Sequence, residues 1–222
     1  MKLQSYVLCV AVSSAVAFLP PAFAAGNVGP WYAGVNAGFA STSIDDASIN
    51  SDLLTVPGIT SASTTSKNES DTGFKLFAGY QVNSNFALEG GYADLGKFKV
   101  DTAVTAFGSP VTAHSEIKAT GWNVDAVGIV PVGNNWSIIG RVGVIRADVK
   151  FDATANGPGG SASDNVSSTT TDMKYGLGVQ LYDVTQAFGI RGEWERYHDL
   201  GDKNTTGQGD VDLWSVGIVV KF

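Results

Sequence analysis

The last ten residues of the chain, 213–222, alternate between two kinds of side chain. The even positions carry Trp214, Val216, Ile218, Val220 and Phe222, and Ser215, Gly217 and Lys221 lie between them. Because a β-strand places alternate side chains on opposite faces, this segment has one apolar face and one small or polar face. In a soluble protein the apolar face packs on a core, whereas in a membrane barrel it meets lipid and the polar face lines the interior.

The start of the chain predicts export from the cytoplasm. One basic residue precedes an apolar run over 6–19, and small residues follow at 22–24. This is the layout of a secretory signal peptide, and the run is shorter than the ~20 apolar residues of a membrane-spanning helix. We therefore divide the chain into a cleaved signal, 1–24, and one domain, 25–222. The only cysteine, Cys9, lies in the signal, so no disulfide or thiolate metal site is expected after export.

Composition excludes several classes of protein. The formal net charge is −7, from 14 basic and 21 acidic residues, and the basic residues are scattered singly, which argues against nucleic-acid binding. No apolar run of ~18 residues follows the signal, so helical membrane spans are not expected. No motif for a cofactor is recognised. A chain with 27 glycines and many aromatic residues, without helical periodicity, favours β-strands.

Eight segments combine alternating side chains with flanking turn residues. They are Trp31–Ala40, Thr72–Tyr80, Phe86–Leu95, Lys118–Val130, Trp136–Lys150, Met173–Tyr182, Phe188–His198 and Val211–Phe222. Short connections at 81–85, 131–135 and 183–187 alternate with long ones at 41–71, 96–117, 152–172 and 199–210. Short turns on one rim and long loops on the other are typical of outer-membrane barrels. The sequence therefore predicts an all-β, eight-stranded, antiparallel up-and-down transmembrane barrel with exposed, mobile long loops.

The inward face of this barrel is predicted to be charged. Bulky apolar residues fall on the lipid side, and the opposite phase carries Lys174, Asn123 and Gln180 together with a network of Lys75, Glu89, Asp125, Arg141, Arg191, Glu193, Glu195 and Lys221. Charges in a dry lumen must be paired or hydrated, and their near-neutral balance favours pairing. An eight-stranded barrel is just wide enough to be filled by its own side chains, so we expect a plugged lumen and not an open pore.

Several motifs occur in the order of a known family. The string 79–96 resembles the second-to-third-strand hairpin of the outer membrane protein A transmembrane domain family. Pro30–Gly34 resembles the first strand of that family, Gly140–Gly143 and Arg146–Asp148 its fifth, and Arg191–Glu195 its seventh. The resemblance covers the exported chain and implies an eight-stranded barrel with short periplasmic turns.

The chain departs from the family pattern in two respects. Full-length members continue into a periplasmic peptidoglycan-binding domain, which is not expected here because the sequence ends at Phe222. The resemblance also implies an interior gate of four charged residues, and Glu89 and Arg191 fall at two of those positions. Val127 and Gln180 stand where a lysine and a glutamate are expected. We therefore interpret the lumen charges as structural filling and not as an ion path.

Basic residues gather on the side of the predicted long loops. They are Lys97, Lys99, Lys118, Arg146, Lys150, Arg196 and Lys203, and the three short turns contain no cation. Lipopolysaccharide phosphates lie at the outer rim and accept charge-assisted hydrogen bonds from such residues. The alternative is ordinary solvated charge, but the asymmetry follows the predicted sidedness and favours the lipid role.

No catalytic or metal site is predicted. His114 and His198 are interpreted as solvated loop residues, because neither can be assembled with a nucleophile and an orienting group. We expect a monomeric outer-membrane protein with a structural and surface-interaction role, exposing its loops to host or phage surface molecules. The alternative is a small passive channel. The resemblance further implies that the terminal Phe222 is a signal for the outer-membrane assembly machinery.

Overall fold

The computed structural model describes residues 29–43, 54–158, 160–183, 187–202 and 207–222. The predicted signal peptide, including Cys9, and the rim residue Lys203 lie outside these ranges. The described strands are β1 (Trp31–Thr42), β2 (Ile59–Asn68), β3 (Ser70–Asn83), β4 (Phe86–Ala106), β5 (Ser109–Pro131), β6 (Trp136–Gly157), β7 (Gly160–Tyr182), β8 (Phe188–Asp202) and β9 (Gly207–Lys221). No helix among the described residues is long and apolar enough to cross a membrane.

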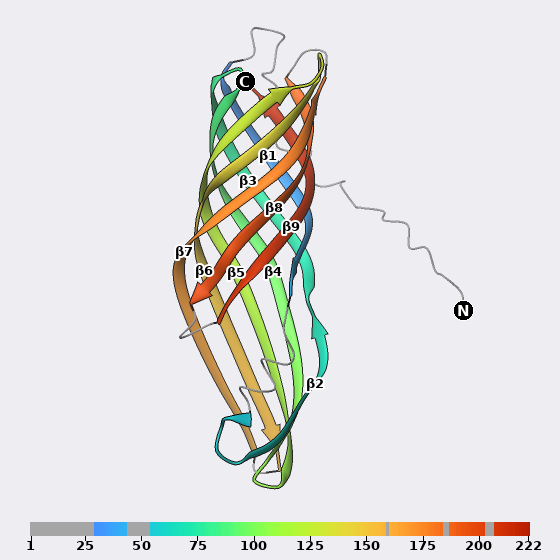
Figure 1. Cartoon of the computed structure of the whole chain (residues 1–222), viewed down its shortest axis with the longest axis vertical. Coiled ribbons are helices and arrows are strands. Elements are labelled where there is room, and N and C mark those ends of the chain that lie inside the picture. Colours follow the sequence, from blue (N-terminus) through green and yellow to red (C-terminus); the bar gives the residue numbers. More distant parts are fainter. Residues whose placement is uncertain (1–28, 44–53, 159, 184–186, 203–206) are drawn as a thin grey trace, which may run out of the picture.

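Eight of these strands close into a ring. The hydrogen-bonded order β4-β3-β1-β9-β8-β7-β6-β5 returns to β4 through an additional pairing of β4 with β5. Every neighbouring pair is antiparallel, and the first and last strands meet along a register that runs from Tyr32 opposite Lys221 to Thr42 opposite Val211. The predicted eight-stranded up-and-down barrel is therefore confirmed (Figure 1), and each of the eight predicted segments lies within a ring strand except for Phe222, one residue past the end of β9.

The short turns are found where they were predicted, but three of the predicted long loops are wrong, because 41–71, 96–117 and 152–172 contain strands. β4 and β5 continue to a two-residue turn at Phe107–Gly108, whose φ values of 51° and 76° are those of a tight hairpin. β6 and β7 likewise stay paired up to Gly157 opposite Gly160. Residues 97–104 do alternate, since Phe98, Val100 and Val104 are buried between exposed or half-buried neighbours, whereas the side chains of 152–172 are mostly small or polar on both faces. Their backbones pair nevertheless.

A ninth strand was missed altogether. β2 lies within the segment 41–71, which was predicted to be a loop, and pairs with β4 from Ile59 opposite Ala106 to Asn68 opposite Lys99. Together with the extensions of β4, β5, β6 and β7 it forms a sheet that projects beyond β1, β8 and β9, away from the short-turn end (Figure 1). We call these elements the projecting sheet: β2, 97–106, 109–118, 149–157 and 160–170.

The outer surface of the ring is apolar. Leu76, Val124 and Leu177 are each 59–62% exposed, as expected of side chains that face lipid and not water. Aromatic residues lie at both ends of this belt: Trp31 packs edge-on against Tyr80 near the short turns, with ring centroids 4.9 Å apart. Near the projecting sheet the corresponding contacts are Tyr92–Trp122, Tyr175–Trp194 and Trp194–Trp214. Such girdles mark the two interfaces of a membrane.

Candidate functional site

The interior of the ring holds a balanced set of charges. Six consecutive strands, β3 to β8, contribute four cations and four carboxylates, none of them more than 6% exposed. They are Lys75, Arg141, Lys174, Arg191, Glu89, Asp125, Glu193 and Glu195. We call these eight residues the lumen cluster. Buried ions of this kind persist only when each is paired, because removing a charge from water costs several kcal/mol after relaxation.

Arg141 on β6 is the centre of the lumen cluster. Its Nη1 lies 2.9 Å from Oε2 of Glu89 and 3.1 Å from Oδ2 of Asp125. Its Nε lies 3.2 Å from Oε1 of Glu195, and its Nη2 donates to Glu193. One planar guanidinium therefore contacts all four carboxylates, which its rigid fork of donors permits and an ammonium group does not.

The two lysines complete the pairing from opposite sides. Lys75 Nζ lies 2.6 Å from Glu193 Oε2 and 2.8 Å from Glu195 Oε2. Lys174 Nζ lies 3.0 Å from Asp125 Oδ2 and 2.9 Å from Glu195 Oε1. Each of these three carboxylates therefore faces at least two cations. Lys174 was predicted to face inward but was left out of the predicted network.

Arg191 joins the cluster at its edge nearest the short turns. Its Nη1 lies 2.6 Å from Glu89 Oε1, and its Nε donates to Gln180 Oε1 at 2.7 Å. The guanidinium carbon lies 4.6 Å from the ring centroid of Phe77 and 5.5 Å from that of Tyr32. Arginine stacks readily on aromatic faces, so this side chain is held by a carboxylate, an amide and two rings.

Two neutral side chains also donate hydrogen bonds to carboxylates of the lumen cluster. Tyr32 donates its hydroxyl to Glu89 at 2.8 Å, and Asn36 donates to Glu193 at 2.7 Å. Sequence reasoning missed both, although they share the inward phase of the first strand. Gly217 makes room for Asn36, since a Cβ there would lie 2.3 Å from the Asn36 Oδ1 atom. An inward glycine is thus required by close approach.

Two apolar layers enclose the lumen cluster. On the short-turn side lie Tyr32, Phe77, Ala87, Val127, Ile139, Tyr182 and Val219. On the other side lie Ala40, Ala93, Leu95, Phe98, Ala119, Ile145, Ala147, Val149, Tyr197, Leu200, Val211 and Leu213. Val127, at a position where the family resemblance led us to expect a lysine, belongs to the first layer. Between these layers no member of the lumen cluster is more than 6% exposed.

Lys221 does not belong to this cluster, contrary to the sequence prediction. It is the last residue of β9, and among the described residues its Nζ makes no ion pair. The nitrogen lies 4.7 Å from the ring centroid of Tyr182, on the side of the apolar layer that faces the short turns. The inward phase of the strand was predicted correctly, but the phase alone does not say how far along the barrel axis a residue lies.

Three of the predicted rim cations form a row across adjacent strands. Lys97 on β4 is directly opposite Lys118 on β5, which is directly opposite Lys150 on β6. We call these residues the lysine row. Like charges in directly opposite positions repel, so such a row needs compensating anions.

Acidic side chains contact two members of the lysine row. Lys97 Nζ lies 2.7 Å from Glu116, and Lys118 Nζ lies 3.4 Å from Asp94. The hydrogen bond that Lys97 donates lowers the pKa of the Glu116 carboxyl and raises that of Lys97. Lys150 makes no ion pair within the described ranges. Lys150 is therefore the member of the row without a direct carboxylate contact among these residues, although Asp148 and Asp152 flank it on the same face of β6.

The other predicted rim cations are less uniform. Lys99 lies 3.5 Å from Glu116. Arg196 forms a two-point contact with Asp212, with distances of 2.7 and 2.6 Å. Arg146 is exposed, and no ion pair is found for it in the part of the chain that the structure describes.

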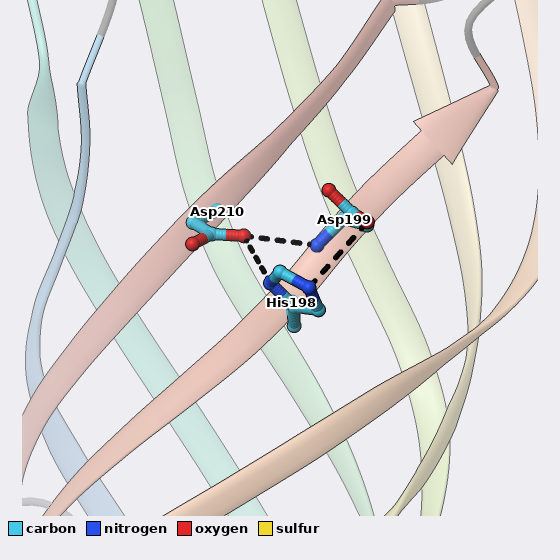
Figure 2. A group of neighbouring side chains, drawn as sticks. All are labelled: His198, Asp199 and Asp210. Carbon is cyan, nitrogen blue, oxygen red and sulfur yellow. Dashed lines mark hydrogen bonds and ion pairs between the residues drawn. The ribbon is translucent and has the colours of Figure 1, made fainter.

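Both histidines lie against aspartates. Figure 2 shows His198 between two carboxylates: its Nδ1 lies 2.7 Å from Asp210, and its Nε2 lies 3.5 Å from Asp199. The ligand atoms of these three residues all lie within 4.8 Å of one another, a spacing that could hold a metal ion. His114 on β5 contacts Asp101 on β4. Both histidines are exposed, as predicted, but both lie on extended strands and not in loops.

Phe222 lies at the closing seam of the ring. Its backbone N–H donates to the carbonyl of Trp31 at 2.9 Å, and its side chain is 53% exposed on the outer face. The last residue thus extends the register between β9 and β1 by one bond.

Two solved structures of outer-membrane proteins are similar to this chain. The chain is similar to Ail, the attachment invasion locus protein of Yersinia pestis, with 15% identity, a TM-score of 0.44, and coverage of 86% of this chain and 99% of that one. It is also similar to the outer membrane protein OprG from Pseudomonas aeruginosa, with 15% identity, a TM-score of 0.47, and coverage of 89% and 98%.

Relatives in sequence are named Outer membrane protein A. The protein from Salmonella typhi is 30% identical over 227 residues, which cover 100% of this chain and 56% of the relative. The protein from Shigella flexneri is 33% identical over 159 residues, or 69% of this chain and 41% of the relative. The chain thus spans about half the length of the first of these.

The comparisons and the closed ring agree on the location of the protein, which is the bacterial outer membrane. The short-turn end is accordingly the periplasmic end, and the projecting sheet is extracellular. The OmpA-like transmembrane domain matches residues 27–222, and the chain belongs to this family.

Proposed function

We propose that this protein is a closed outer-membrane barrel with a structural and surface-interaction role. The observation that carries the proposal is the lumen cluster, a neutral set of eight buried charges between two apolar layers. The barrel anchors the chain in the membrane, and the extracellular projecting sheet is the part that meets other molecules.

The closed lumen follows from the energetics of the cluster. An ion that crosses must pass two apolar layers and displace side chains from Arg141, whose guanidinium contacts four carboxylates. Breaking a buried pair by removing one partner typically costs ~3–5 kcal/mol. The alternative, a small passive channel, requires this cluster to open.

The projecting sheet suits surface interaction because it is large, polar and rigidly anchored. Its strands continue directly from the ring, so the backbone hydrogen bonds of the barrel extend to the turn at Phe107–Gly108. Exposed Ser, Thr, Asp and Asn side chains on β2 and on 160–170 provide hydrogen-bonding groups on a fixed framework. Host or phage surface molecules and neighbouring envelope components are the partners that we propose.

The lysine row is proposed to bind lipopolysaccharide phosphates. Lys118 precedes Trp122 by four residues on the same face of β5. Four residues of extended strand span about 13 Å, so Lys118 lies that far from the aromatic girdle, at the level of lipid headgroups. Phosphate oxygens would supply the direct anionic contact that Lys150 does not make among the described residues. We assign no enzymatic activity, because the partners of His114 and His198 among the described residues are aspartates and not nucleophiles.

Planar-bilayer recording of refolded protein tests the closed lumen. We expect no steady conductance from the wild-type protein, and only brief openings from a Glu89→Gln variant, because Arg141 and Arg191 then lose a shared carboxylate. A Glu116→Gln variant, altered outside the membrane, serves as the matched control and should behave like wild type. Steady wild-type conductance that changes with Glu89→Gln but not with Glu116→Gln would establish the channel instead.

A further inference from the structure

A small polar cavity opens at the periplasmic end of the barrel. Its volume is about 240 Å³. Tyr32, Tyr182 and Arg191 line it next to the apolar layer, and the amides of Gln81 and Gln180 lie further round its wall. Lys221 completes the lining from the end of β9. We call this cavity the periplasmic vestibule.

The vestibule has an unbalanced positive charge. Its lining residues include two cations and no carboxylate. The charge of Arg191 is matched by Glu89, which lies 2.6 Å from it. Lys221 has no such partner in the described part of the chain, and residues 1–28 and 184–186, outside that part, contain no aspartate or glutamate. The ring of Tyr182 beneath its Nζ offers only a cation–π contact.

Hydrogen-bond donors surround this charge. Besides the two glutamine amides, Asn134 and Asn135 and the hydroxyls of Ser84 and Ser137 line the vestibule. Asn135 already donates to the backbone carbonyl of Tyr182 at 2.8 Å, and this bond fixes the turn against the wall. A lysine with neutral donors around it is a chemical match for an oxyanion, which accepts hydrogen bonds and needs positive charge.

We propose that the periplasmic vestibule binds a phosphate oxyanion, with Lys221 as the contacting cation and the neutral donors around it completing the site. The volume equals that of about eight liquid water molecules at ~30 Å³ each, so a phosphate fits with some of its hydration retained. The phosphate is either free inorganic phosphate in the periplasm or the headgroup of a phospholipid in the inner leaflet. Both sources reach this end of the barrel.

Solution NMR of the refolded protein in a zwitterionic detergent tests the site with inorganic phosphate as the probe. We expect saturable shifts of the backbone amides of Gln180, Tyr182 and Lys221, and no such shifts with chloride at equal ionic strength. A Lys221→Met variant should bind at least tenfold more weakly, and Lys221→Arg should retain binding. Lys99→Met removes the same charge at the opposite end and should leave the affinity unchanged.

A second arm identifies the source of the phosphate. The same amides are followed as phosphatidylglycerol is added to the micelles without free phosphate. Saturable shifts with this lipid alone assign the site to a headgroup, and saturable shifts with inorganic phosphate alone assign it to the free anion, provided in each case that Lys221→Met abolishes them. Shifts that chloride reproduces, shifts that survive in a folded Lys221→Met protein, or no shifts with either probe would overturn the proposal.

Discussion

Arg141 contacts all four carboxylates of the lumen cluster, and Lys75, Lys174 and Arg191 provide their other cation partners. Replacing Arg141 with methionine keeps much of the side-chain volume but leaves four carboxylates facing three cations in a dry interior. We expect the Arg141→Met protein to lose ~3–5 kcal/mol of unfolding free energy, measured by urea titration in lipid vesicles. Adding Glu89→Gln restores formal neutrality and should recover part of the loss. A single variant within ~0.5 kcal/mol of wild type would contradict the central role of Arg141.

The effect of replacing Lys118 on stability is predicted to depend on lipopolysaccharide. Lys118 has a lysine directly opposite on each side, so Lys118→Gln should not lower stability in detergent free of lipopolysaccharide, and a gain of ~0.2–1 kcal/mol is expected from lost repulsion. In contrast, the stabilisation that added lipopolysaccharide confers should shrink. Unfolding curves with and without lipopolysaccharide measure both effects. Lys67→Gln, on β2 and outside the row, is the control with the same change of charge, and an equal loss there would argue against the row.

The ring strands could be predicted from sequence, and the projecting sheet could not, for a physical reason. Strands such as β9 separate lipid from lumen, so each carries an alternating apolar pattern that a reader of the sequence can see. β2 and 160–170 are largely exposed on both faces, and backbone hydrogen bonds with a few hydroxyl contacts, such as Ser61 to Thr105 and Thr169 to Asp148, hold them in register. Periodicity does not encode the pairing registers of the strands. These registers decide how deep Lys221 lies along the barrel axis, and they bring Tyr32 and Asn36 to the carboxylates of the lumen cluster.

The projecting sheet should be dispensable for barrel formation. Phe98 and Ile117 are directly opposite each other, so a variant in which 99–116 is replaced by Asn-Gly closes β4 and β5 with a tight turn just above the apolar layer. We expect β2 to lose its pairing partner while the ring persists. The unboiled variant should still migrate differently from the boiled one in detergent gels, with reduced attachment to any cell or phage partner. Failure to show this shift would mean that the sheet is needed to fold the barrel.

Membrane insertion of the whole chain is predicted to depend on its final residue. Phe222 adds a hydrogen bond to the carbonyl of Trp31 and an exposed aromatic ring at the periplasmic belt. Deleting Phe222 should lower the folded fraction in outer-membrane preparations more than deletion of one residue from a periplasmic turn, for which Gly133 is suited because nothing lies within 4 Å of a Cβ built there. Equal losses would leave no special role for the terminus in assembly.

The distribution of charge around the ring bears on how such a barrel closes. Every member of the lumen cluster lies on β3 to β8, whereas β1 and β9 contribute neutral groups such as Asn36 and Ser215. The joint between the first and last strands is therefore made without bringing ions together along its length. Lys75 on β3 reaches Glu193 and Glu195 on β8 across the two joining strands. These ion pairs can form only when β1 and β9 are paired, and they must break before the ring can reopen between these two strands.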